Sequence, residues 1–492
     1  MKRHILLITY LTCLALVISC SASNGGGGGN NGNNGNNGDD GELDTSFDND
    51  GIFIFDSQNA PINDRFAEGR TLQEFQQIKD QKRNKLIDEM QQTGFNPILQ
   101  KRINNLRNQF DDEGFAIAFD NVNDKIVVAG TSEDNNSINL VVIRLEDDGD
   151  LDQTFNNGAA VIFENAGGNT IAVELVQING NQSVTVFGSV EDVNTNDVNF
   201  AIFNVDQNGA NPQELVENTI DSDAVAGIAL DAGGNAVVAF DDDADNDGNQ
   251  DDIVVARFTA GTVNVDVTFN NNTGSTAILN SVPQNIGVNA AGDIFVCGTQ
   301  GTNALIAKMD NGGVLDAGFD GANNGNGAVT FTLGAADSFQ AINFDGNDPV
   351  VCGFTTNAGI TTVLVAKFDD GDGDLVNNFG ANNGSANFEV VVGSATNVGN
   401  AIFIDNNDLF VVGFSDDAGT NRGFIALLDD DGALQAGFGA GGFFISQDIG
   451  GAGSADEFFA ITQDLDDNDI LAIGTTGIAG QDDDLVVVKV SN

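Results

Sequence analysis

The chain has 492 residues and a formal net charge of −55, with 73 acidic against 18 basic residues, no Trp, one His and one Tyr. Such an acidic balance argues against nucleic acid or anionic membrane surfaces as partners. Because His4 and Tyr10 both precede residue 20, the rest of the chain lacks an imidazole, which excludes Ser-His-Asp and Cys-His catalysis and His-ligated zinc there.

Residues 1–19 have the pattern of a secretory signal peptide. A positive start at Lys2 and Arg3 precedes an apolar run, residues 5–18, that is too short to span a bilayer. The run ends in Val17-Ile18-Ser19-Cys20, which resembles the lipobox of bacterial lipoproteins. The resemblance implies that Cys20 is the lipidated first residue of the mature chain and, with Ser21 after it, that the protein is anchored in the outer membrane. Plain secretion is the alternative.

Residues 20–42 are predicted to be a flexible tether, because Gly and Asn dominate residues 24–42 and cannot bury enough apolar surface to fold. Loss of the signal peptide leaves 16 basic residues against 73 acidic ones. We interpret this acidity as favouring solubility, with a cation-binding surface as the alternative.

From residue 43 onward, a unit of about 58 residues recurs seven times, which is typical of repeat architectures. Six units contain an L-x-x-x-F run or a near copy of it, closed by Phe47, Phe155, Phe269, Phe319, Phe379 and Phe438. A large, stiff aromatic at each unit boundary favours a structural wedge between neighbouring units. A ligand contact is the alternative.

Each unit shows four short apolar runs of strand length, at residues 52–55, 115–119, 125–130 and 139–145 in the first unit. Turn clusters of Asn, Asp and Gly separate the second run from the third. The third run ends on Gly130, Gly188, Gly298, Gly353, Gly413 and Gly474. The fourth run carries a cation in most units, Arg144, Arg257, Lys308, Lys367 and Lys489. We expect these cations to blunt an exposed edge strand, or alternatively to form a binding ring.

Seven units of four strands predict an all-β fold, a seven-bladed β-propeller over residues 43–492, because radial stacking covers both faces of every sheet. Residues 43–47 with Gly51, then residues 125–130, 142–145 and 148–152, are similar to the delta-60 repeat of bacterial surface and secreted proteins. The resemblance implies a β-propeller and no settled activity.

Residues 58–110 interrupt the first unit and differ from the rest in chemistry. They hold nine cations. Thr71-x-x-Glu74 is a capping box, and Leu99, Ile103, Leu106 and Phe110 share one face of a second helical stretch. We predict an inserted α-helical hairpin. It either docks on the acidic propeller as decoration or serves as a lid or partner-docking element.

One acidic loop has the spacing of a calcium site. Asp243, Asp245, Asp247 and Asp251, with Gly248 at the turn, follow the front half of an EF-hand loop. Val254 stands where the bidentate Glu belongs, so we predict a weak Ca²⁺ site or, alternatively, an Asp-rich turn arising from composition. Cys297 and Cys352 are expected to be small core residues.

These features favour a non-enzymatic, lipid-anchored propeller of the cell envelope, a monomeric domain that acts in binding, adhesion or scaffolding. Its partner would be a protein or polysaccharide, and its contact with the membrane would be through the N-terminal lipid only. One alternative is a structural subunit of an envelope complex docked through residues 58–110. A carboxylate-dependent hydrolase of envelope or extracellular glycans is the other, because two suitably spaced acids suffice for that chemistry.

Overall fold

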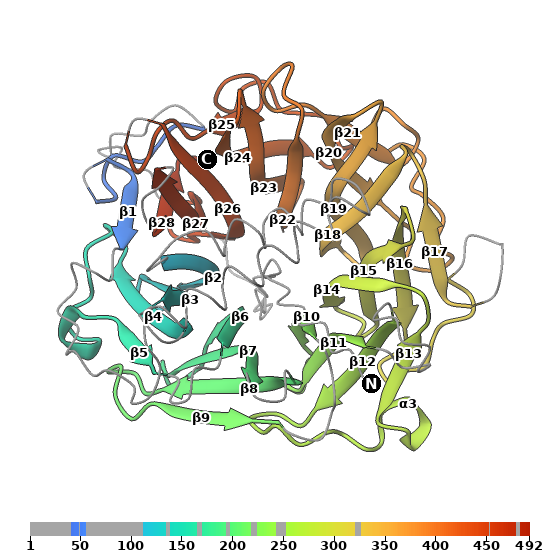
Figure 1. The fold of residues 1–492 in the computed structure, drawn as a ribbon, viewed down its shortest axis with the longest axis horizontal. Coiled ribbons are helices and arrows are strands. Elements are labelled where there is room, and N and C mark those ends of the chain that lie inside the picture. The colour runs from blue at the N-terminus through green and yellow to red at the C-terminus, as the bar shows by residue number, and fades with distance from the viewer. Residues whose placement is uncertain are drawn as a thin grey trace, which may run out of the picture.

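The computed structural model describes residues 41–48, 50–55, 112–133, 138–164, 170–192, 197–217, 224–242, 252–319, 326–451, 453–478 and 483–492. Within these residues the chain forms seven antiparallel blades of four strands around a common axis, the first two of which are joined by one parallel bridge between Ile138 and Thr170 (Figure 1). The predicted all-β, seven-bladed β-propeller is therefore confirmed. The signal peptide, most of the tether and the predicted helical hairpin at 58–110 lie outside the described residues.

Six blades are built from consecutive strands, the first of each lying innermost. Blade 1 comprises β2 (Asp112–Asp120), β3 (Lys125–Glu133), β4 (Ile138–Glu146) and β5 (Val161–Phe163), and blade 2 comprises β6 (Thr170–Ile178), β7 (Val184–Asp192), β8 (Asp197–Val205) and β9 (Gln213–Val216). Blade 3 comprises β10 (Ala224–Leu230), β11 (Ala236–Asp242), β12 (Asp252–Phe258) and β13 (Ser275–Ile278), and blade 4 comprises β14 (Val282–Val288), β15 (Ile294–Gln300), β16 (Asn303–Met309) and β17 (Ala328–Phe331).

The second half of the ring continues the same order. Blade 5 comprises β18 (Ala336–Asp345), β19 (Asp348–Asn357), β20 (Ile360–Lys367) and β21 (Ser385–Phe388), and blade 6 comprises β22 (Asn397–Asp405), β23 (Asp408–Asp417), β24 (Thr420–Asp429) and β25 (Phe443–Ile445). Blade 7 comprises β26 (Ser454–Gln463), β27 (Ile470–Ile478), β28 (Asp483–Val490) and, from the start of the chain, β1 (Ile52–Phe55). Two single turns, η1 (Asn156–Gly158) and α3 (Phe269–Asn272), are the helical structure of the described part.

The ring closes because β1 pairs with β28. The register places Ile52 opposite Val488 and Phe55 opposite Leu485, so the first described strand completes the last blade. The sequence repeat and the structural blade are therefore out of phase by one strand. The first run of each repeat is the outer strand of the preceding blade, and the fourth run is the third strand of its own blade.

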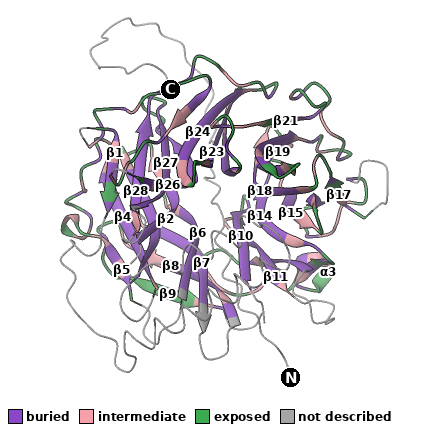
Figure 2. Ribbon diagram, turned by 45° about the horizontal axis from the view of Figure 1, so that its top comes forward, coloured by how far each residue is buried: buried purple, intermediate pink, exposed green. Residues whose placement is uncertain are grey.

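The inner strands of the blades are buried on both faces, since each blade lies between two others, whereas outer strands such as β9 are partly exposed (Figure 2). In β4 every residue between the two ends is buried, and the six C-terminal residues of β28 are buried as well. This explains why the third strands read as continuous runs of Val, Ile and Leu instead of alternating.

A bulge in the innermost strand explains the recurring glycine of the second strand. In all seven blades the register between these two strands shifts by one residue, as between Gly399 and Ala401 in blade 6. The bulge turns a carbonyl toward the second strand, and a methyl group on Gly413 would lie 1.9 Å from the carbonyl oxygen of Val398. Only glycine fits there. Blade 3, where Phe240 faces the same shift, is the exception.

Among the described residues, no helix combines the length and the apolar character that crossing a bilayer would require.

Candidate functional site

The recurring cations lie between blades, where three are buried and Arg257 and Lys367 are half-buried, and the expectation that they blunt an exposed edge was wrong. Arg144 is 9% exposed, Lys308 6% and Lys489 1%. The physical reason is the phase of the repeat: these residues lie on third strands, which an outer strand covers, and not on the edge.

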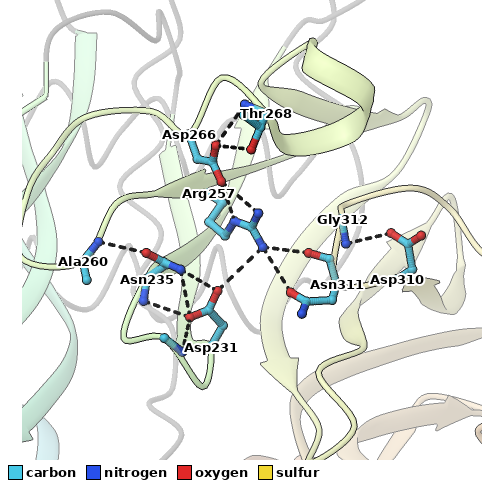
Figure 3. A network of polar contacts seen from close by, with 10 residues as sticks. Asp231, Asn235, Arg257, Ala260, Asp266, Thr268, Asp310, Asn311 and Gly312 are labelled. Atoms are coloured by element: carbon cyan, nitrogen blue, oxygen red, sulfur yellow. Dashed lines mark hydrogen bonds and ion pairs between the residues drawn. The ribbon is translucent and has the colours of Figure 1, made fainter.

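The half-buried Arg257 shows which contacts the recurring cation makes (Figure 3). Its Nε and Nη2 atoms donate to Oδ2 of Asp266, at 3.0 and 2.8 Å, and its Nη1 atom donates to the carbonyl oxygen of Asn311 in blade 4, at 2.7 Å. The guanidinium also lies 5.1 Å from the ring centre of Phe269. One side chain thus connects its own strand, the aspartate and phenylalanine of the boundary motif, and the turn of the next blade.

The same arrangement recurs around the ring. Arg144 donates to Asp152 at 2.7 Å and to the carbonyl oxygen of Gln207 in blade 2 at 2.9 Å. Lys308 donates to the carbonyl oxygen of Asp370 in blade 5 at 2.7 Å. These contacts are charge-assisted hydrogen bonds inside a packed boundary, where they are stronger than neutral ones.

Where the boundary aspartate is missing, the cation changes role or is absent. In blade 5 Val376 replaces the aspartate, and Lys367 pairs with Asp345 of its own blade instead. In blade 6 Gln435 replaces the aspartate, and its backbone N–H donates to the carbonyl oxygen of Leu427. Leu427 therefore occupies the position that the recurring cation takes in other blades. Where the aspartate is lost, the cation is therefore either lost as well, as in blade 6, or paired with another acid, as in blade 5.

The six phenylalanines that end the boundary motif lie in the core. Phe47, Phe155, Phe269, Phe319, Phe379 and Phe438 are each at most 2% exposed. A methyl group on Gly313 of blade 4 would lie 2.3 Å from the Phe269 ring, and one on Gly432 of blade 6 would lie 2.9 Å from the Phe379 ring. Each of these two rings thus packs against a turn of the following blade, which is the position expected for a wedge between neighbouring blades.

The boundary between blades 7 and 1 holds a larger charged group, which we call the closing cluster: Asp44, Asp147, Asp464, Asp467, Asp469 and Lys489. The ammonium of Lys489 lies 2.7 Å from Asp147, 2.7 Å from Asp464 and 3.1 Å from Asp467. The carboxylates of Asp44, Asp467 and Asp469 form a second group whose oxygens lie within 4.8 Å of one another. The cluster thus joins the N-terminal segment, a turn of blade 1 and two parts of blade 7.

Burial and mutual repulsion perturb these acids. Burial, followed by the hydrogen bond with Asp147, raises the pKa of Asp464 to about 7. Burial, followed by the charge of Asp467, raises the pKa of Asp469 to about 7. Burial opposes the charge on Lys489, but the hydrogen bonds to Asp147 and Asp464 outweigh it and hold the pKa of the ammonium above its usual range. The cluster therefore exchanges protons near neutral pH.

Sequence reasoning did not identify the closing cluster. Its members lie at residues 44, 147, 464–469 and 489, and only ring closure brings them together. The run from Asp464 to Asp469 reads as an ordinary hairpin turn, and Lys489 reads as one of five similar cations. The one available signal was the unusual number of acids in that turn.

The inner strands begin with further polar residues that the sequence did not single out. Asp337 accepts hydrogen bonds from the backbone of Leu333 and Gly334, and Asn397 accepts one from Val390. Asp456 accepts from Ser446 and Thr476. Each of these buried side chains fixes the loop that crosses from the preceding blade, so their role is structural.

The remaining predicted site residues are the calcium-loop aspartates, the lipidation cysteine and two core cysteines. The calcium-loop residues Asp243, Asp245, Asp247 and Asp251 and the lipidation residue Cys20 lie outside the described residues. Cys297 and Cys352 are buried and free, and burial raises the pKa of both thiols. A buried thiol of raised pKa is a poor nucleophile, so a core role fits both.

Comparison with solved structures finds distant similarity to proteins of varied function. Sqt1 from Chaetomium thermophilum, in a structure with the N-terminus of ribosomal protein L10, is 11% identical, with 78% of this chain and 98% of that chain covered and a TM-score of 0.42. The β-propeller domain of the trilobed protease from Pyrococcus furiosus is 7% identical, covering 77% and 93%, with a TM-score of 0.42. The polysaccharide lyase Uly1 is 9% identical, covering 77% and 90%, with a TM-score of 0.41.

At these identities and scores the likeness concerns the fold alone. No protein-family model and no curated protein matches the chain.

Proposed function

We propose that the protein is a non-enzymatic scaffold of the cell envelope, a lipid-anchored propeller that presents one face to a protein or polysaccharide partner. The observation that carries this proposal is the use of the recurring charges. Arg144, Arg257, Lys308 and Lys489 bond to the following blade, so the most regular charged groups of the chain hold the ring together. The lack of imidazole after residue 4 supports the same reading.

The face for a partner follows from the course of the chain. In a four-stranded meander, the loops after the second and fourth strands emerge on one side of the ring. β1 ends at Phe55 and β2 begins at Asp112, so the two described strand ends that flank residues 58–110 both lie on that side. The same side exposes apolar side chains on the loops of blades 3 to 6, namely Leu279, Leu333, Ile360 and Val392. We infer that this side, to which the cation-rich residues 58–110 are attached, is the face offered to a partner.

The test is a pull-down from native envelopes with the full-length chain and with a chain lacking residues 58–110, each with and without Ca²⁺. We expect a partner that co-purifies with the full-length chain and is lost on deletion, while both chains retain the same unfolding midpoint.

Three outcomes would contradict parts of the proposal. Turnover of an envelope polymer at saturating concentration would contradict the non-enzymatic reading. Isolation of the wild type alone from its own membrane would contradict the scaffold. A Cys20→Ala chain that still fractionates with the membrane would contradict the lipid anchor.

A further inference from the structure

The ring depends on one short segment for its closure. Six blades are continuous in sequence, whereas blade 7 takes its outer strand from residues 41–55. Gly41 donates its N–H to the carbonyl of Ser491 at 2.7 Å, and Asp44 donates to the carbonyl of Lys489 at 2.9 Å. These bonds and the pairing of β1 with β28 join strands from the two ends of the described chain, so release of β1 is the local opening that would open the ring.

The closing cluster lies at this joint and has an excess of acid. One ammonium, Lys489, faces three carboxylates directly, and Asp44 and Asp469 adjoin them. At the equivalent boundary of blade 4, Lys308 faces two carboxylates, Asp293 and Asp316. The boundary between blades 7 and 1 thus has more carboxylates around its lysine than the boundary of blade 4, where the chain is continuous.

Further charged groups surround the cluster. From blade 1, Asp124 opposes Asp466, whose pKa the contact raises, and Lys125 attracts Asp147. Lys125 is itself paired with Glu146, so its charge is partly compensated. When every acid is ionised, one lysine ammonium at the centre must balance carboxylates from three separate parts of the chain, and buried like charges repel strongly.

We propose that the closing cluster is a proton-controlled latch: a proton on Asp464, which is hydrogen-bonded to Asp147, and a proton on Asp469 hold the N-terminal strand on blade 7, and full ionisation loosens it. Protonation removes repulsion between Asp464 and Asp147 and between Asp469 and its neighbours Asp44 and Asp467. The latch is therefore tight in mildly acidic surroundings and weaker in alkaline ones.

The latch predicts a local change in hydrogen exchange. Exchange of the β1 amides is followed in the whole protein, in buffer with chelator, between about pH 5.5 and pH 8.5, after correction for the intrinsic pH dependence of exchange. The outer strand β13 serves as the internal reference. We expect protection of β1 to fall at least about tenfold more than protection of β13 as pH rises, since one unit of pKa corresponds to a factor of ten. Equal changes in the two strands would overturn the proposal.

Two variants make the test specific. Asp464→Asn and Asp469→Asn imitate the protonated acids, so each should retain strong β1 protection at the alkaline end and flatten the pH profile. Asp293→Asn, at the boundary of blade 4, is the matched control and should leave the β1 profile unchanged. If both cluster variants keep the full wild-type profile, the latch does not exist, and if they do not fold, the wild-type comparison of β1 with β13 still decides.

Discussion

At the scale of single residues, the most demanding positions are the glycines opposite the bulges. A methyl group on Gly413, Gly474 or Gly130 would lie between 1.8 and 2.0 Å from a backbone carbonyl oxygen of the innermost strand. Backbone atoms cannot retreat as a flexible side chain can, so any larger residue must distort the bulge. The recurrence of glycine here reflects geometry and not flexibility.

Gly413→Ala is therefore expected to cost about 1–3 kcal/mol of unfolding free energy, the range for strain forced into a packed site. Gly437→Ala is the matched control, because a methyl group there would meet no atom within 4 Å. That control should be neutral or slightly stabilising. Urea titration of both variants checks the pair, and equal losses would contradict the role assigned to the bulge.

The sequence revealed these glycines and the boundary phenylalanines as regular features but misread the cations. Spacing alone showed that Arg144 and Lys489 recur, yet it did not show which strand of a blade they occupy. The repeat begins on an outer strand, so counting runs from its start moved every strand by one place. The fourth run of each repeat was therefore expected to be the edge strand of its blade, whereas it is the third strand, which the outer strand covers.

At the scale of elements, the boundary between blades is a small ionic unit in an apolar setting. Arg144 is nearly buried and Asp152 is wholly buried, and Asp152 also accepts hydrogen bonds from the backbone and hydroxyl of Thr154. Burial favours the neutral acid, but the Thr154 and Arg144 contacts outweigh it and hold the pKa of Asp152 below its usual value. Asp152 is thus held as a carboxylate, and both it and Arg144 have hydrogen-bond partners.

Arg144→Met should cost about 3–5 kcal/mol, because it leaves a buried carboxylate without its cation. Arg144→Met combined with Asp152→Asn should recover part of that loss, since the uncompensated charge is then gone. A double-mutant cycle by urea unfolding measures the coupling. Losses that simply add, with no recovery, would show that the two side chains do not act as a unit.

At the scale of the whole molecule, acidity and ring closure are linked. Asp464 and Asp469 have folded-state pKa values of about 7, above those of an unfolded chain. Between the two values the folded protein holds protons that the unfolded chain has released, so stability falls as pH rises toward and through 7. Asp152 has a lowered pKa and works in the opposite sense, but only in strong acid.

The midpoint of thermal unfolding should therefore be higher at about pH 5.5 than at about pH 8, by a few degrees. Differential scanning calorimetry at constant ionic strength measures it, and constant salt is needed because screening alone changes repulsion in a chain this acidic. A midpoint that rises steadily from the acidic to the alkaline end would contradict the pKa values assigned to the closing cluster.

The repeat predicted the number of blades, because that number follows from counting the units. The closing cluster was beyond prediction, since Asp44, Asp147 and Asp464 are separated by many residues and meet only in three dimensions. Residues 58–110 break the repeat, and the pattern that predicts the blades does not extend to them.

The central claim is that the ring is closed by pairing of β1 with β28, and a disulfide between them tests it most directly. Ile54 stands opposite Val486, so Ile54→Cys with Val486→Cys places two thiols at the separation of directly opposed strand residues, about 5 Å between Cα atoms. Ile54→Cys with Val490→Cys is the control, displaced by four residues along β28, or about 13 Å. We predict nearly complete crosslinking of the first pair and none of the second under mild oxidation. An uncrosslinked first pair, or equal crosslinking of both, would contradict the closed propeller.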